Sequence, residues 1–211
     1  MKRSLALLVA CAALYGFAIG ASTSWTYAAR NLVKFPLLIV GTAAVCALCY
    51  DVLARFLGAH FGFVAVQRAV LAVFRDTTVL LASLSPAVFW FARTMTRPSG
   101  RDLGDYPLFQ GFNVAAIAVS GCLAVRLPAR RLLAEHALGA GKRRMLLGSW
   151  MLVSLLVGGQ LAWYLRPFFG IAAADAPPPE RWFDGDTPDF RGARSFYEAV
   201  WNLVAPPHGW R

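Results

Sequence analysis

Five long apolar stretches, each nearly free of charged residues, occupy most of the first 166 residues of the chain. Five such stretches are not expected in a water-soluble domain of this length, whereas a helix of about 20 apolar residues spans the hydrocarbon core of a bilayer. The sequence therefore predicts an all-α fold, a polytopic transmembrane helical bundle over residues 1–166. The five predicted spans cover about 4–21, 36–57, 69–92, 108–125 and 145–165.

Composition supports a membrane protein. The chain is 58% hydrophobic and 15% charged, against about 25% charged in an ordinary soluble domain. Its net charge of +10 comes from Lys and Arg beside the spans, where they set orientation and meet anionic headgroups. Since no basic face with interleaved aromatic residues stands apart from the spans, we expect no nucleic-acid partner. The lipid bilayer, including its anionic headgroups, is the first partner that the sequence predicts.

The distribution of Lys and Arg between the loops predicts the orientation. The segment between the fourth and fifth spans carries six of them. Together with the N-terminus and the loop after the second span, the predicted inner side holds eleven, against five in the outer loops. Because positively charged loops stay in the cytoplasm, we expect a multi-pass protein of a bacterial inner membrane. Its N-terminus is predicted to be cytoplasmic and its C-terminus extracytoplasmic.

The first span also has features of a secretory signal peptide. Lys2 and Arg3 precede the apolar run, and Ala18-Ile19-Gly20 fits a cleavage site. We expect the span to be retained, because the apolar run is long, and removal of the span is the alternative.

Residues 167–211 differ in composition and form the predicted extracytoplasmic tail. Ala176-Pro177-Pro178-Pro179 is typical of a stiff, extended linker. Ser195-Phe196-Tyr197-Glu198 matches a capping box and predicts a short amphipathic helix through about Val204. Its apolar face would be unstable in water, so we expect the helix to lie on the outer membrane surface or to dock on the bundle.

Four charged residues lie within two of the predicted spans. Asp51 and Arg55 are one helical turn apart near the inner end of the second span, and Arg75 and Asp76 lie at a matching depth in the third. We expect Asp51 to pair with Arg75, and Arg55 with Asp76. Such a cluster is either a structural clasp between two helices or a site that handles protons or ions. The complementary signs favour the clasp.

Three amide side chains lie toward the outer side. Gln110 and Asn113 are near the start of the fourth span, and Gln160 is near the end of the fifth. Spans joined by one loop are expected to be antiparallel neighbours, so these amides are predicted to hydrogen-bond between the helices. A substrate site at the same place is the alternative.

No catalytic, cofactor or metal site is predicted from the sequence. Cys46-Ala-Leu-Cys49 has the spacing of redox and zinc sites, but it lies in an apolar span and lacks a second ligand pair. Asp184-Gly185-Asp186 is similar to the start of a calcium loop, but Ser195 stands where such a loop needs a carboxylate.

The end of the fifth span carries a longer motif. The stretch from Gly158 to Gly170 fits the pattern G-x-Q-L-x-W-x-L-R-P-F-x-G and includes Arg166, Pro167 and Phe168. It resembles a family of uncharacterised bacterial multi-pass membrane proteins that share this motif after the last span. The resemblance implies a helical inner-membrane protein and brings no known activity. Some members carry an automatic actin-binding label, but this sequence shows no amphipathic helix followed by a basic L-K-K-T-like strand.

The sequence therefore favours a non-enzymatic role, as a scaffold or subunit of a membrane assembly whose partner is another membrane protein or a second copy of the chain. The alternative is a small transporter or channel. Its path would be lined by Asp51, Arg75, Asp76, Asn113 and Gln160.

Overall fold

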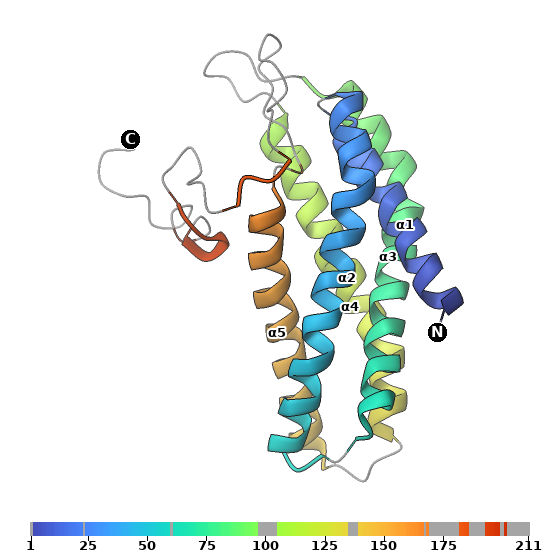
Figure 1. The fold of residues 1–211 in the computed structure, drawn as a ribbon, viewed down its shortest axis with the longest axis vertical. Helices are drawn as coiled ribbons and strands as arrows, with labels where there is room; N and C mark the ends of the chain where they lie inside the picture. Colours follow the sequence, from blue (N-terminus) through green and yellow to red (C-terminus); the bar gives the residue numbers. More distant parts are fainter. Residues whose placement is uncertain are drawn as a thin grey trace.

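Five α-helices make up the computed structural model of the chain (Figure 1), which describes residues 2–22, 24–59, 61–96, 105–134, 139–166, 168, 182–185, 193–198 and 201. The helices are α1 Lys2–Gly20, α2 Trp25–Phe56, α3 Phe63–Thr94, α4 Tyr106–Ala134 and α5 Ala140–Leu165. All five contain a segment long and apolar enough to cross a membrane. The prediction of an all-α bundle is confirmed for the described residues, with five helices long and apolar enough to span a membrane.

Most of the helices are longer than the predicted spans. At 1.5 Å per residue, the 32 residues of α2 extend for about 48 Å, well beyond the ~30 Å of a hydrocarbon core. The helix begins at Trp25 because the Ser24 hydroxyl accepts a hydrogen bond from the Tyr27 backbone N–H at 3.3 Å. The predicted span of about 36–57 starts too late, since α2 begins at Trp25 and Pro36 lies well inside it.

Helix α1 lies between α2 and α3 and packs extensively on both. Helix α4 packs on α3, and α5 packs on α2. The expectation that the fourth and fifth helices are packing neighbours is therefore wrong: each has its main interface with a different helix. The short connection keeps the end of α4 close to the start of α5. It does not determine which helix each of them packs against along its length.

Close contact between α1 and α2 depends on two glycines. A Cβ added at Gly20 would lie 2.6 Å from the Ala28 Cα, and one added at Gly16 would overlap the Asn31 carbonyl. Small residues let helix backbones approach in the bilayer, where dispersion forces rather than hydrophobicity hold helices together. At these two positions the backbones of α1 and α2 lie too close for any residue larger than glycine.

Buried side chains form two clusters along the length of the bundle. The first contains residues of α1 such as Leu8 and Tyr15, with Leu81 of α3 and Phe109 of α4. The second lies between α2, α3 and α5 and contains Cys46, Tyr50, Val66, Leu146 and Trp150. Helix α1 contributes to the first cluster alone because it is short. Its N-terminus lies about halfway along α3 (Figure 1).

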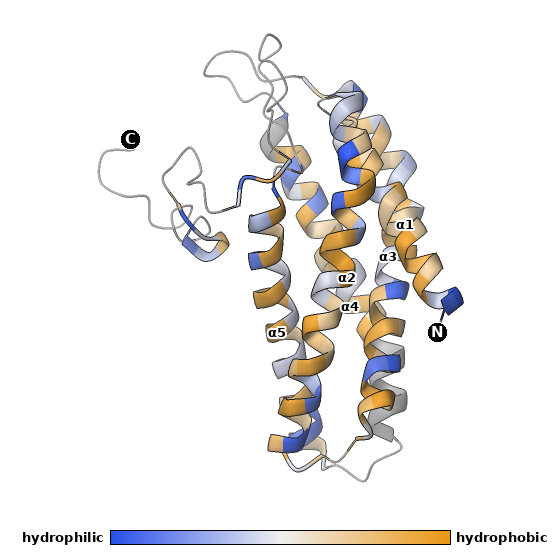
Figure 2. Cartoon of the chain, in the orientation of Figure 1, coloured by the Kyte–Doolittle hydropathy of each residue, from blue (hydrophilic) through white to orange (hydrophobic). Residues whose placement is uncertain are grey.

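Apolar residues occupy much of the length of the helices (Figure 2), and many of them face outward. Large exposed side chains occur on every helix, among them Leu14, Val52, Val64, Val119 and Leu155. A soluble protein does not expose apolar surface on this scale. Such faces are stable in contact with lipid chains.

Candidate functional site

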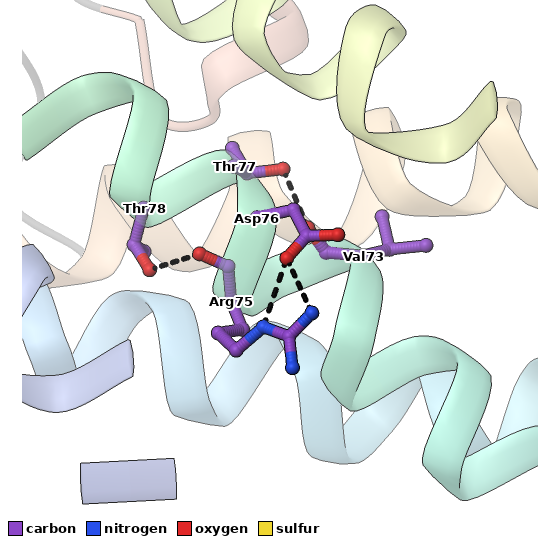
Figure 3. Close-up of polar contacts among 5 residues, drawn as sticks. All are labelled: Val73, Arg75, Asp76, Thr77 and Thr78. Atoms are coloured by element: carbon purple, nitrogen blue, oxygen red, sulfur yellow. Dashed lines mark hydrogen bonds and ion pairs between the residues drawn. The ribbon is translucent and has the colours of Figure 1, made fainter. Parts of the chain in front are cut away.

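The four charged residues predicted to form a cluster pair within their own helices. On α2, the Arg55 Nε donates to the Asp51 Oδ2 at 2.9 Å, one turn apart. On α3, Arg75 pairs with its neighbour Asp76 (Figure 3). The predicted pairs Asp51 with Arg75 and Arg55 with Asp76 are therefore wrong. A partner on the same helix is already held at short range by the backbone, so it needs no interhelical alignment.

The Arg75–Asp76 pair lies in the middle of α3 and is fixed by several contacts. The Arg75 Nε and Nη2 both donate to the Asp76 Oδ1, at 2.8 and 2.6 Å. The flanking hydroxyls of Thr77 and Thr78 donate to the Val73 and Arg75 carbonyls (Figure 3). About a third of each charged side chain is exposed. The pair is positioned but remains open to the surroundings.

The predicted amide contacts are replaced by a different one. The Tyr15 hydroxyl of α1 donates to the Asn113 Oδ1 at 2.8 Å, and the Asn113 Nδ2 donates to the Phe109 carbonyl at 2.8 Å. Gln110 is exposed, and the buried Gln160 Oε1 has no hydrogen bond from a described residue. Asn113 thus bonds between helices as predicted, but to α1 and not to Gln160.

A second polar contact joins α2 to α5, and the sequence analysis missed it. The Tyr50 hydroxyl donates to the Trp150 carbonyl at 2.9 Å and shares a hydrogen bond with the Ser154 hydroxyl. The Tyr50 and Trp150 rings are stacked with centroids 4.9 Å apart. A tyrosine in the middle of a span was the available signal, because its hydroxyl needs a partner away from water. Beside it lies a cavity of about 30 Å³.

The cysteines of the C-x-x-C spacing lie on this face of α2. Cys46 is buried and Cys49 is half-buried, and both are free thiols. The Cys46 Sγ lies 4.0 Å from the Ser154 hydroxyl. The described residues hold no group of three His, Cys, Asp or Glu side chains that could bind a metal ion.

The segment after α5 folds back over the first turns of α2. The Asn31 Nδ2 donates to the Phe168 carbonyl at 2.8 Å. The Lys34 Nζ lies 5.2 Å from the centre of the Phe183 ring, and the Arg30 guanidinium lies 5.7 Å from that of Trp182. Lys34, one of the five Lys and Arg residues that the charge count placed in the predicted outer loops, is buried inside the structure. The face of the Phe183 ring attracts the Lys34 ammonium electrostatically at a position that water does not reach.

Arg166 of the sequence motif caps the end of α5. Its Nε donates to the Trp163 carbonyl at 3.1 Å, and its guanidinium stacks 3.5 Å from the centre of the Trp163 ring. The motif therefore ends a helix whose last carbonyls need donors. Phe168 packs edge-on against Phe35 of α2, whereas Pro167 and Gly170 lie outside the described residues.

The start of the predicted tail helix contacts the bundle. The Glu198 N–H donates to the Ser195 Oγ at 3.2 Å, as the predicted capping box requires. The Glu198 carboxylate accepts from the Arg194 N–H at 2.7 Å, one residue before the Ser195 N–H that a capping box uses. The Phe196 ring lies against Gly159, and the Tyr197 hydroxyl bonds the Leu156 carbonyl. Burial raises the pKa of the Tyr197 phenol. Of the two predicted placements, these contacts correspond to docking on α5. Residues from 202 onward lie outside the described ones.

The two ends of the α3–α4 connection are joined by Asp105. Its carboxylate accepts a hydrogen bond from the Thr96 backbone N–H at 2.8 Å. This bond, together with one from the Thr96 hydroxyl, holds the pKa of the Asp105 carboxyl below its ordinary value. The contact is exposed and serves to close the connection.

Comparison with known proteins gave no match among family models, curated proteins or solved structures.

Proposed function

We propose that the protein is a non-enzymatic component of a bacterial inner membrane, a scaffold or subunit of a larger assembly, with its N-terminus in the cytoplasm. One observation carries the proposal: the polar contacts that the bundle contains are separate and local. Asn113 bonds Tyr15 between α1 and α4, Tyr50 bonds α5, and the two ion pairs stay within α2 and α3. Groups paired in this way hold helices together.

A transporter or channel needs those polar groups to face a common water-filled path. Asp51 is on α2, Asp76 on α3, Asn113 in the α1–α4 contact and Gln160 on α5 beside the tail. Their dispersal over several interfaces supports a closed bundle. The lipid-facing apolar surfaces of α4 and α5, which each have one main packing partner, are where a membrane partner or a second copy would pack.

Cysteine accessibility tests the proposal. Single cysteines are placed at positions 51, 75, 76, 113 and 160 in a variant whose four native cysteines are replaced by serine or alanine. Membrane-impermeant maleimide is then added from each side, with a cysteine at Gly139 as the control for a position at a helix end. We expect labelling at position 113 only after denaturation. Labelling of positions 51, 113 and 160 in the native state would contradict the closed bundle and support a path.

Isolation from the membrane tests the assembly directly. The full chain, tagged at its N-terminus, is purified in a mild detergent and analysed by size exclusion with multi-angle light scattering. We expect a stoichiometric second protein or a defined oligomer. A monodisperse single copy without a partner would contradict the scaffold.

A further inference from the structure

The lateral surface of the bundle has a hollow of about 170 Å³ where α1 begins. Ser4 of α1 lines it together with Arg68, Leu71, Ala72 and Arg75 of α3. It exists because α1 starts about halfway along α3 (Figure 1), so the first turns of α3 have no α1 beside them. At ~30 Å³ for each water molecule in the liquid, the hollow has room for a phosphate group.

The charges around this hollow are mostly positive. Arg68 and Arg75 are seven residues apart, two helical turns, and therefore lie on one face of α3. Arg68 is exposed. The Asp76 carboxylate holds the Nε and Nη2 of Arg75, and no described residue bonds its Nη1. Asp76 thus orients the Arg75 guanidinium, and the Nη1 of Arg75 can still donate to a ligand.

The first turn of α1 adds to the positive charge. Lys2 and Arg3 come directly before Ser4, and the first backbone N–H groups of a helix have no acceptor within it. The helix dipole favours an anion at the same end. Two arginines of α3 therefore line the hollow together with Ser4, and the first turn of α1, which carries Lys2 and Arg3, begins at its edge.

We infer that this hollow binds the phosphate of an anionic phospholipid. Its lining combines arginines with apolar Leu71 and Ala72, and it opens on the outer surface of helices whose exposed faces are apolar, as at Leu5 and Val64. A phosphate that carries acyl chains matches both features, with its headgroup between the arginines and its chains along the helices. The inference requires that the bundle lies in a bilayer, and it holds whether or not the protein is a scaffold.

Native mass spectrometry of the full chain in detergent, titrated with phosphatidylglycerol and separately with phosphatidylcholine, tests this site. We expect one high-affinity phosphatidylglycerol and weaker phosphatidylcholine binding. Arg68→Gln and Arg75→Gln should each weaken phosphatidylglycerol binding by about fivefold, from the contribution of one basic residue near an anionic membrane. Arg143→Gln, a basic position at the start of α5, is the matched control and should leave this affinity unchanged. Because Arg68 is exposed and outside the ion pairs, its variant keeps the test valid if Arg75→Gln does not fold.

The same titration separates the other outcomes. Equal affinity for phosphatidylcholine, or an equal loss in Arg143→Gln, would show general attraction to charge and overturn the site. Inorganic phosphate alone, at millimolar concentration, should not displace the lipid. If it binds at this hollow and the lipid does not, the ligand is a soluble phosphate and the lipid assignment is wrong.

Discussion

Single hydrogen bonds link segments that are far apart in the sequence. Tyr15 and Asn113 are separated by 98 positions, and Asn31 and the Phe168 carbonyl by 137. Hydrogen bonds between helices in bilayers contribute about 0.6 kcal/mol on average, so none of these determines stability alone. Their effect is selective, because a misaligned helix would leave a buried polar atom without a partner. At the residue scale, polar side chains determine which faces meet.

Replacement of the Tyr15 hydroxyl tests this selectivity. Tyr15→Phe should destabilise the protein by about 0.6 kcal/mol and at most ~1.7 kcal/mol, because the buried Asn113 Oδ1 loses its donor. Reversible unfolding in mixed SDS micelles measures the change, and a double-mutant cycle with Asn113→Leu isolates the coupling. Tyr164→Phe, at an exposed position, is the control. Additive effects of Tyr15→Phe and Asn113→Leu would contradict the contact.

Charge reversal distinguishes pairs within a helix from pairs between helices. Arg75→Asp alone should reduce expression of folded protein, because an unpaired charge in a membrane costs up to about 2.5–3.5 kcal/mol, less at a partly exposed position. The double change Arg75→Asp with Asp76→Arg should restore expression, since both side chains are about a third exposed. The double change Asp51→Arg with Arg75→Asp should not. Recovery by the second combination would favour an interhelical pair.

At the scale of single helices, glycine positions set how closely α1 and α2 pack. Gly16 and Gly20 face the backbone of α2 directly, whereas Gly121 of α4 and Gly148 of α5 have no atom within 4 Å of an added Cβ. The same residue type therefore has two roles in one bundle. Two glycines permit a close approach, and the other two lie on open surface.

Alanine substitutions separate these roles. Gly16→Ala and Gly20→Ala should each cost about 1–3 kcal/mol, because the methyl group forces the α1 and α2 backbones apart. Gly121→Ala should be neutral or stabilising by up to about 1 kcal/mol, from helix propensity. Unfolding midpoints in detergent give the order of the variants. Similar midpoints for Gly16→Ala and Gly121→Ala would show that the close approach is absent.

Helix positions could be predicted from the apolar pattern, and helix ends could not. The pattern reports which residues favour lipid, but a helix continues past that boundary where local residues allow it. Helix α2 thus begins at Trp25, with Ser24 as its cap, and passes through Arg30, Asn31 and Lys34 before the apolar run. These polar residues are accommodated by aromatic rings and a carbonyl from beyond α5. A contact with such a distant segment leaves no periodic signal near residue 30.

At the scale of the whole molecule, the property least predictable from the sequence was which helix packs on which. Short connections predicted that consecutive helices lie side by side, which holds for α1 with α2 but not for α4 with α5. The charged residues were placed at comparable depths, but their pairing depended on side-chain reach within one helix. Asn113 was predicted to bond between helices, and its partner Tyr15 depended on tertiary packing that composition does not specify.

Fusions with topology reporters test the proposed orientation. Alkaline phosphatase joined after Arg211 should be active, and green fluorescent protein inserted at residues 135–138 should be fluorescent, because the basic segment around that connection is predicted to be cytoplasmic. The reciprocal fusions should be inactive. A fluorescent fusion after Arg211 would reverse the orientation and, with it, the leaflet that supplies the proposed lipid.

The first helix accompanies α3 over only part of its length, because α1 begins beside the middle of α3 (Figure 1). The first turns of α3 therefore have no described residue of α1 beside them. In a bilayer, acyl chains must fill that notch, so the outline that the protein presents to lipid is concave on this side.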